Sequence, residues 1–204
     1  MSSTEIRRLM TLVEDANNPS MPVNITKIKA LVRKYFNMRK IEFEVQDDGT
    51  VNILKNCHIR AKDNIEFAQF PVKFGRIEGD FAVQDCGLET LVGGPTEIRG
   101  TFDIKHNKLS SLHGSPQVHG GHYYCNGNPL ISLDGLPTSF TGNLYCDWHR
   151  NLPLLRLLNC SLVSTSNAVV NRIMNQYAGN PSRANIVQCH KQLINAGFAG
   201  NASL

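Results

Sequence analysis

The sequence has no long apolar segment. No stretch of about 18 consecutive apolar residues, the shortest length that crosses a bilayer as a helix, occurs in its 204 residues. The first residues include Glu5, Arg7 and Arg8, where a secretory signal would carry an apolar run. We therefore expect a cytoplasmic protein that does not enter a membrane.

Closely spaced cysteine pairs are also missing. The six cysteines are scattered, and none belongs to a Cys-x-x-Cys motif. Thiols stay reduced in the cytosol, so we expect all six to be free. They are Cys57, Cys86, Cys125, Cys146, Cys160 and Cys189.

The sequence lacks the common catalytic motifs. Gly93-Gly94 and Gly120-Gly121 are not followed by the Lys-Ser/Thr pair of a phosphate-binding loop, and no Gly-x-Ser-x-Gly motif is present. Cys189 and His190 are neighbours on an expected helix, where adjacent side chains do not face each other. We therefore predict that the protein is not an enzyme and needs no cofactor.

Strong charge of one sign is absent too. The 21 basic and 17 acidic residues give a net charge of +4, which is too small for a dedicated nucleic-acid binder. With 41% hydrophobic residues, the chain can form one sizeable core with small appendages, but hardly two large domains. We expect a single cooperative unit.

A 21-residue repeat occupies the middle of the chain. Shifting the sequence against itself by 21 places aligns triplets whose first and third residues are apolar. This alternation predicts strands with one buried face. The triplets are Phe81-Ala82-Val83, Phe102-Asp103-Ile104, Tyr123-Tyr124-Cys125 and Leu144-Tyr145-Cys146.

Further landmarks keep the same period. Two leucine series predict two inward contacts per coil beyond the strand: Leu88, Leu109 and Leu130, then Leu91, Leu112, Leu133 and Leu154. Each coil then has a turn marked by proline, at Pro95, Pro116 and Pro137. Ile98, His119 and Phe140 follow three residues later, and a glycine marks the bend back into the strand at Gly100, Gly121 and Gly142. One period earlier, equivalent positions hold Phe67, Phe70, Ile77 and Gly79.

The middle coil reads Phe102-x-Ile104-x-x-Asn107-x-Leu109-x-x-Leu112, which resembles the leucine-rich repeat. The resemblance implies an α/β fold, namely a short solenoid of about four to five coils with a one-sided stack of parallel strands.

Asparagine has a defined role in that family, where its side chain bonds backbone groups as the chain leaves the strand. Asn107 and Asn128 keep this residue, whereas Cys86 and His149 replace it. We therefore expect the outer coils to be less regular.

A narrower resemblance comes from the consensus pattern Gly-x-Phe-x-(Ile/Cys)-x-x-Asn-x-Leu-x-x-Leu-x-Gly-x-Pro. This pattern is similar to that of repeat proteins encoded by many tailed bacteriophages. The segments 47–51 and 67–77 are similar to the lead-in of those proteins. The resemblance spans roughly residues 41 to 155. It implies a fold but no specific activity, and a phage-encoded protein would act in the host bacterial cytosol.

The flanks of the repeats read as helical caps, which a solenoid needs to cover its apolar ends. We predict an N-terminal helical cap at 1–40, a hairpin lead-in at 41–59, the leucine-rich-repeat stack at 60–158 and a C-terminal helical cap at 159–204.

Each cap is expected to be a helix pair. The N-terminal pair would contain a helix that begins with a capping box from Ser2 to Glu5 and a helix over 25–36. In the C-terminal pair, a helix over 169–177 is closed by Gly179, and a last helix begins at Asn180-Pro181 and stops at Gly197. The tail 199–204 reads as loose.

Side chains between the apolar strand positions must face solvent, on what we expect to be the concave side of the stack. Adjacent strands lie about 4.8 Å apart, so Tyr124 and Tyr145 should lie side by side, with Trp148 one row away. Exposed aromatics among charges are typical of an interface. The predicted partner-binding residues are Asp103, Lys105, His106, His122, Tyr124, Asn126, Tyr145, Asp147, Trp148 and Arg150. Alternatively, Trp148 and the tyrosines pack under the C-terminal helices as part of the cap.

The leading functional hypothesis is a non-enzymatic phage protein that binds a bacterial host or defence protein and modulates or inhibits it. The alternative is nucleic-acid association through a basic run with no acidic residue, unless this run is only the solvated face of a helix. The run comprises Lys27, Lys29, Arg33, Lys34, Arg39 and Lys40. The oligomeric state stays open.

Histidines and cysteines in three coils also raise the question of a metal site or an unrecognised active site. They are His106, His113, His119, His122, Cys125, Cys146 and His149. However, Cys125 and Cys146 hold inward strand positions, where cysteine acts as a small buried hydrophobe. His119 matches Ile98 in a core position, and His119-x-x-His122 alone is weak evidence for zinc. We predict no metal.

Overall fold

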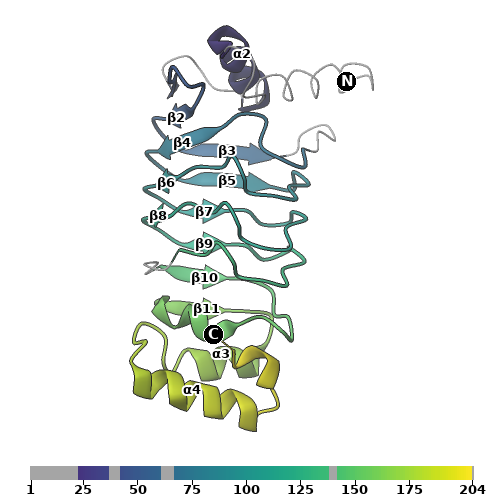
Figure 1. Ribbon diagram of the computed structural model, residues 1–204, viewed down its shortest axis with the longest axis vertical. Helices are drawn as coiled ribbons and strands as arrows, with labels where there is room; N and C mark the ends of the chain where they lie inside the picture. Colours follow the sequence, from purple (N-terminus) through teal and green to yellow (C-terminus); the bar gives the residue numbers. More distant parts are fainter. Residues whose placement is uncertain (1–22, 37–41, 61–66, 138–141, 204) are drawn as a thin grey trace.

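The chain folds into an upright stack of short coils with a helix at one end and several helices at the other (Figure 1). The structure, a computed structural model, describes residues 23–36, 42–60, 67–137 and 142–203. Strands of successive coils pair in parallel, so the predicted repeat solenoid of about five coils is confirmed. None of the described helices is long and apolar enough to cross a membrane.

The repeat triplets form the central strands of one sheet, all parallel. Phe102 pairs with Phe81 on one side and with Tyr123 on the other, which is the register that the 21-residue period predicts. The strands, in spatial order, are β11 (Leu162–Ser164), β10 (Asn143–Tyr145), β9 (Tyr123–Tyr124), β7 (Phe102–Asp103), β5 (Phe81–Gln84) and β3 (Cys57–Arg60).

A second sheet runs along another side of the same coils, so the expected one-sided strand stack was wrong. Ile77, Ile98 and His119 pair in sequence, and the bond from the Gly120 N–H to the Ile98 carbonyl continues the ladder. Its strands are β1 (Phe43–Val45), β2 (Val51–Ile53), β4 (Phe74–Ile77), β6 (Glu97–Ile98) and β8 (Val118–His119). The predicted hairpin is β1 and β2, the antiparallel pair at its edge.

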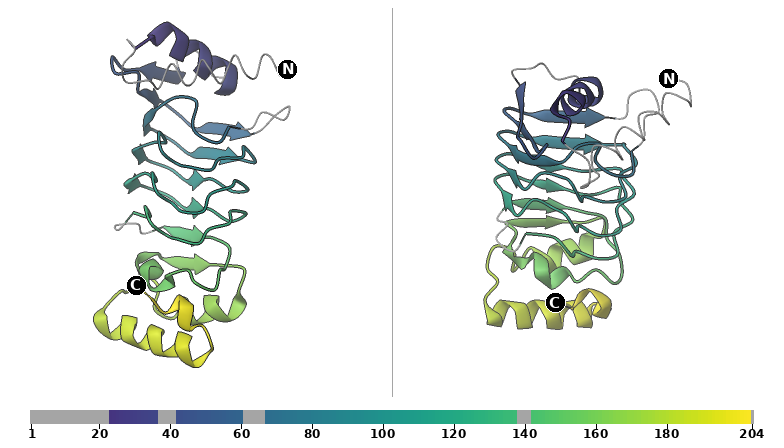
Figure 2. Two further views of the ribbon diagram at one scale, coloured as in Figure 1. Left: turned by 45° about the vertical axis from the view of Figure 1, so that its right-hand side comes forward. Right: turned by 45° about the horizontal axis from the view of Figure 1, so that its top comes forward.

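Two strand ladders also explain the shape of the stack. Solenoids curve when one side spaces its coils more widely than the other. Here both sides carry strands with the same spacing of about 4.8 Å. The stack is accordingly nearly straight in two views, so the surface expected to be concave is closer to flat (Figure 2).

The strand ladder extends beyond both predicted limits of the stack. At one end, Cys57 pairs with Phe81, three residues earlier than the period predicts. At the other end, β11 adds a strand beyond residue 158 by pairing Tyr145 with Ser164. Cys57 and Val163 are fully buried, so burial and backbone pairing, not the period, set the register of these outer coils.

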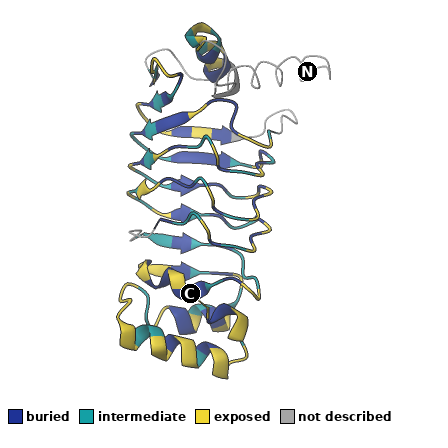
Figure 3. Ribbon diagram, viewed as in Figure 1, coloured by how far each residue is buried: buried dark blue, intermediate teal, exposed yellow. Residues whose placement is uncertain are grey.

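The core is a continuous column between the two sheets, and burial is concentrated there (Figure 3). Both predicted leucine series are buried. Aromatic rings continue from coil to coil: the centroids of Phe81 and Phe102 are 6.1 Å apart, and those of Phe102 and Tyr123 are 5.1 Å apart. The fully buried Tyr123 hydroxyl lies 2.7 Å from the Ser115 Oγ, which satisfies both groups.

Buried asparagines link the coils as the resemblance implied. Asn107 Oδ1 accepts hydrogen bonds from the N–H groups of Cys86 and Leu88, both at 3.1 Å. Its Nδ2 donates to the carbonyl of Val83 in the same neighbouring coil at 2.8 Å. Asn128 repeats the arrangement one coil later. These side chains satisfy backbone groups that would otherwise be buried without partners.

Helix α2 (Ile25–Phe36) covers the N-terminal end of the stack. Asn24 begins it, since its Oδ1 accepts a hydrogen bond from the Lys27 N–H at 3.0 Å. Ile28, Leu31 and Val32 are buried on its inner face. The second helix of the predicted N-terminal pair is thus confirmed, whereas the one expected to begin at Ser2 lies outside the described residues.

The C-terminal cap contains the predicted helix pair. The pair is α3 (Ala168–Met174) and α4 (Arg183–Asn195), and the cap also includes the short helices η2 (Leu154–Asn159) and η3 (Ala199–Asn201). Helix α4 begins later than expected from Asn180-Pro181. Its N-cap is Ser182, whose Oγ accepts a hydrogen bond from the Asn185 N–H.

Residues 201 and 202 of the tail expected to be loose are packed. Asn201 is fully buried and Ala202 nearly so. Asn201 Nδ2 donates to the carbonyls of His149 and Leu152, at 2.8 and 3.0 Å. These bonds join the end of the chain to the loop after β10 and make the tail part of the cap.

The six cysteines are free, as predicted, and all six are buried. Burial raises the pKa of Cys57 and of Cys160 to about 12, and a hydrogen bond with Cys146 together with burial raises that of Cys125. The thiols of these three residues therefore stay protonated near neutral pH, when they are poor nucleophiles.

His119 should make stability depend on pH. Burial lowers its pKa from 6.5 to about 4, so the folded state holds a neutral ring among Phe102 and Tyr123. The unfolded chain binds the proton more tightly than the folded state does. The stability that the neutral His119 ring contributes is therefore complete above pH 6.5 and is lost as the pH falls toward 4. We expect the free energy of unfolding to fall by at most about 3 kcal/mol over this range.

Urea titrations at several pH values would measure this dependence. His119→Ile places there the residue found at Ile98, one coil earlier, and should flatten the pH profile. An equal pH dependence in the variant and the wild-type protein would contradict the assignment to His119.

Candidate functional site

Two tyrosines stack on the outer face of the β11–β3 sheet. Tyr124 on β9 and Tyr145 on β10 are register neighbours, and their side chains point outward from the apolar row. Their ring centroids lie 4.5 Å apart with an interplanar angle of 7°. The predicted side-by-side placement is confirmed, and it follows from parallel pairing in register.

The ring pair is held by its neighbours on both flanks. Lys105 Nζ lies 5.1 Å from the Tyr124 ring centroid, within the range of a cation–π interaction. His122 meets both rings edge-on, with centroid distances of 6.3 and 6.5 Å. Asn143 Nδ2 donates to the Tyr145 hydroxyl at 3.4 Å. We call Lys105, His122, Tyr124, Tyr145 and Asp147 the tyrosine face.

The Tyr124 hydroxyl is a neutral hydrogen-bonding group. Partial burial, followed by the effects of Tyr145 and Asp103, raises the pKa of Tyr124 above its usual value of 10. The phenol therefore stays protonated at neutral pH and can both donate and accept.

The prediction that Asp103 faces solvent was wrong. It is only 9% exposed, because its Oδ2 accepts a hydrogen bond from Gln84 Nε2 and lies 3.1 Å from Lys105 Nζ. The Lys105 N–H donates to its other oxygen. Asp103 thus positions the lysine over Tyr124 and offers little surface of its own.

A shallow hollow of about 390 Å³ borders the rings. It brings together Lys105, Tyr124, Asn126, Tyr145 and Asp147, all predicted from the sequence. Strand β11 contributes Ser164, and the segment after it contributes Thr165 and Ser166; these residues were not predicted because β11 has no repeat motif.

His106, also predicted to bind a partner, does not line this hollow and lies at the turn after β7. Its backbone is left-handed, with φ 54°, and its side chain is exposed. The Asn126 carbonyl accepts a hydrogen bond from the His106 N–H at 3.0 Å, so the turn is tied to the next coil.

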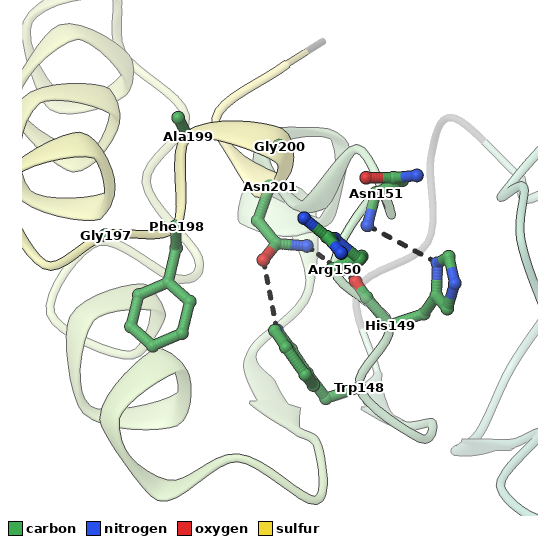
Figure 4. Close-up of a pocket in the computed structure, with 9 residues that line it drawn as sticks. All are labelled: Trp148, His149, Arg150, Asn151, Gly197, Phe198, Ala199, Gly200 and Asn201. Carbon is green, nitrogen blue, oxygen red and sulfur yellow. Dashed lines mark hydrogen bonds between the residues drawn. The ribbon is translucent and has the colours of Figure 1, made fainter.

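Trp148 and Arg150 do not line the hollow beside the tyrosines. They line a pocket of about 640 Å³ between the loop after β10 and the chain end, drawn in Figure 4. Trp148 Nε1 donates to Asn201 Oδ1 at 3.0 Å, and the Phe198 ring lies edge-on to the indole at 6.0 Å. Packing within the cap, the alternative left open by the sequence, is confirmed for Trp148. The tyrosines instead remain half-exposed.

The described part of the basic run lies on α2, at the opposite end of the stack from this pocket. Lys27 and Lys29 are half-exposed and Arg33 is exposed. The Lys34 side chain lies outside the described part of the chain, and so do the whole residues Arg39 and Lys40. Nucleic-acid association through this run stays a prediction.

The histidines and cysteines of the repeats were considered as possible metal ligands. Cys125 and Cys146 are buried in the inward strand positions expected for them. Within the described residues, no group of three or more His, Cys, Asp or Glu side chains has an arrangement that could hold a metal ion.

Comparisons with protein-family models, with curated proteins and with solved structures found no significant match for the chain.

Proposed function

We propose that the protein is a non-enzymatic binding module that holds a protein partner against the tyrosine face. In keeping with the bacteriophage resemblance of its repeats, the partner would be a bacterial host or defence protein that this binding modulates or inhibits. The stacked pair Tyr124 and Tyr145 is the observation that carries the proposal.

Preorganisation supports this role. Tyrosine offers a large contact area with few rotatable bonds, so it loses little conformational entropy when a partner binds. Here both rings are already held by each other, by Lys105 and by His122. The strands beneath them pair on both sides, which makes the scaffold rigid.

The surroundings have the composition of an interface. Aromatic side chains lie at the centre, with polar groups around them. Lys105 carries a positive charge on one side of the rings and Asp147 a negative charge in the hollow. A partner with groups of complementary charge would be oriented along the row of strands.

Replacing either tyrosine should weaken partner binding strongly. Tyr124→Ala or Tyr145→Ala removes half of the ring pair and frees its neighbour, so we expect a loss of about 2 kcal/mol, or roughly 30-fold in affinity. Partners would be captured from bacterial lysate on the wild-type protein, identified by mass spectrometry and purified, and their affinity for each variant measured by calorimetry.

Val118→Ala is the matched control, since Val118 is 58% exposed on β8 of the other sheet. It should bind the partner as tightly as the wild-type protein does. A purified partner that binds both tyrosine variants with unchanged affinity would rule out the tyrosine face as the contact surface.

A further inference from the structure

The pocket at the C-terminal end is built from two segments far apart in the sequence. One is the loop 148–151 between β10 and η2, and the other is the segment 197–201 after α4. Figure 4 shows Trp148 and Phe198 on one side of the pocket, with His149 and Asn151 on the other. Its volume of about 640 Å³ suits a small ligand or one large side chain.

The two segments are locked together, so the pocket exists before any ligand binds. Asn201 is fully buried and bonds Trp148, His149 and Leu152 at 2.8 to 3.0 Å. Gly200 allows the close approach, because a Cβ atom there would lie only 2.3 Å from the Arg150 carbonyl oxygen. A preformed pocket loses little free energy to rearrangement on binding.

The lining selects for an aromatic group and for negative charge. Trp148 and Phe198 supply two aromatic rings. Arg150 and His149 also line the pocket, and none of its nine lining residues is acidic. Arg150 is exposed and forms no ion pair with a described residue. Its guanidinium group is therefore available to a carboxylate, which it can bind through two parallel hydrogen bonds.

We propose that this pocket binds an aromatic carboxylate, with the ring against Trp148 and Phe198 and the carboxylate on Arg150. The ligand would be either a free aromatic acid or the aromatic C-terminal residue of a polypeptide, since both present the same groups. The site is separate from the tyrosine face and does not depend on its proposed role.

The only tryptophan of the protein lies in this pocket, so its fluorescence reports binding there directly. Titration with N-acetylphenylalanine, which has a free carboxylate, should change the Trp148 emission to saturation. The neutral N-acetylphenylalanine amide has the same ring and size and should bind about tenfold or more weakly. 3-Phenylpropanoate, which keeps the ring and the carboxylate at the same spacing but lacks the peptide group, distinguishes the sources: equal affinity indicates a free acid, and weaker binding indicates a chain end.

Arg150→Gln tests the anchor of the carboxylate. It keeps a polar side chain but removes the guanidinium charge, and should weaken binding of N-acetylphenylalanine about tenfold or more, with little change for the amide. Arg156→Gln is the matched control, because Arg156 is an exposed arginine on η2 that pairs with Asp134 outside the pocket. It should leave binding unchanged.

Three results would overturn the proposal. They are no saturable change of emission with either acid, equal affinity of the wild-type protein for N-acetylphenylalanine and its amide, and unchanged binding of the acid by Arg150→Gln. The comparison of acid with amide uses the wild-type protein, so it decides the question even if a variant loses stability.

Discussion

Asn107→Ala should destabilise the protein by about 3–5 kcal/mol, because several buried backbone groups lose their hydrogen-bond partner at once. Asn107 is 6% exposed and accepts hydrogen bonds from the N–H groups of Cys86 and Leu88. It also donates to the carbonyls of Val83 and Ile104. Alanine satisfies none of these groups.

Asn128→Ala is the internal comparison for this result. Asn128 accepts a hydrogen bond from the N–H of Leu109 and donates to the carbonyls of Ile104 and Cys125. With one bonded N–H where Asn107 has two, we expect a smaller loss, of about 2–3 kcal/mol. Urea denaturation followed by circular dichroism would give both values. A loss below about 1 kcal/mol for Asn107→Ala, the size of a single ordinary hydrogen bond, would contradict the role of this side chain.

Phe102→Ala should lower the free energy of unfolding by about 3–5 kcal/mol. Phe102 is fully buried in the middle of the stack, with the rings of Phe81 and Tyr123 at 6.1 and 5.1 Å. Solenoid stability is approximately a sum over contacts between neighbouring coils. A cavity at this position weakens two such contacts together, and relaxation is limited because both neighbours are also packed against further coils.

Phe102→Leu separates ring contacts from simple filling of space. Leucine keeps most of the apolar volume but removes the edge-to-face contact with Tyr123, so it should lose less than half as much as alanine. Chemical denaturation of the two variants and the wild-type protein provides the measurement. Alanine and leucine variants of equal stability would show that Phe102 does not fill the core as described.

Most of the strand register could be predicted because it depends on local periodicity. Tyr124 and Tyr145 are 21 residues apart in adjacent parallel strands, so the repeat alone placed them side by side. The buried leucine series and the inward cysteines followed from the same alternation. The role of Asn107 came from the resemblance to leucine-rich repeats, and the structure confirms it.

The second sheet was missed although its landmarks were visible. Ile98 and His119 had been recognised as core positions in register with Ile77. However, neither Ile98 nor His119 has an apolar residue two positions away, so no alternating pattern marks β6 and β8. Pairing of these strands depends on backbone hydrogen bonds between coils, which composition does not reveal.

Burial of individual polar groups was also beyond the sequence. Asp103 occupies an outward strand position, yet Gln84 of the neighbouring coil and Lys105 cover it. No periodicity predicts which side chains will reach across a coil to do this, because the outcome depends on rotamers and on the charges nearby.

The sequence by itself determined the repeat, the central strands of the main sheet and their side-by-side tyrosines, since each follows from the 21-residue period. Only the tertiary structure decided the second sheet, the burial of Asp103 and the pocket around Trp148. The pocket depends on Asn201, more than fifty residues further along the chain, whose side chain bonds the loop after β10. Contacts at such separations arise when the capping helices pack on the stack, and no local pattern encodes them.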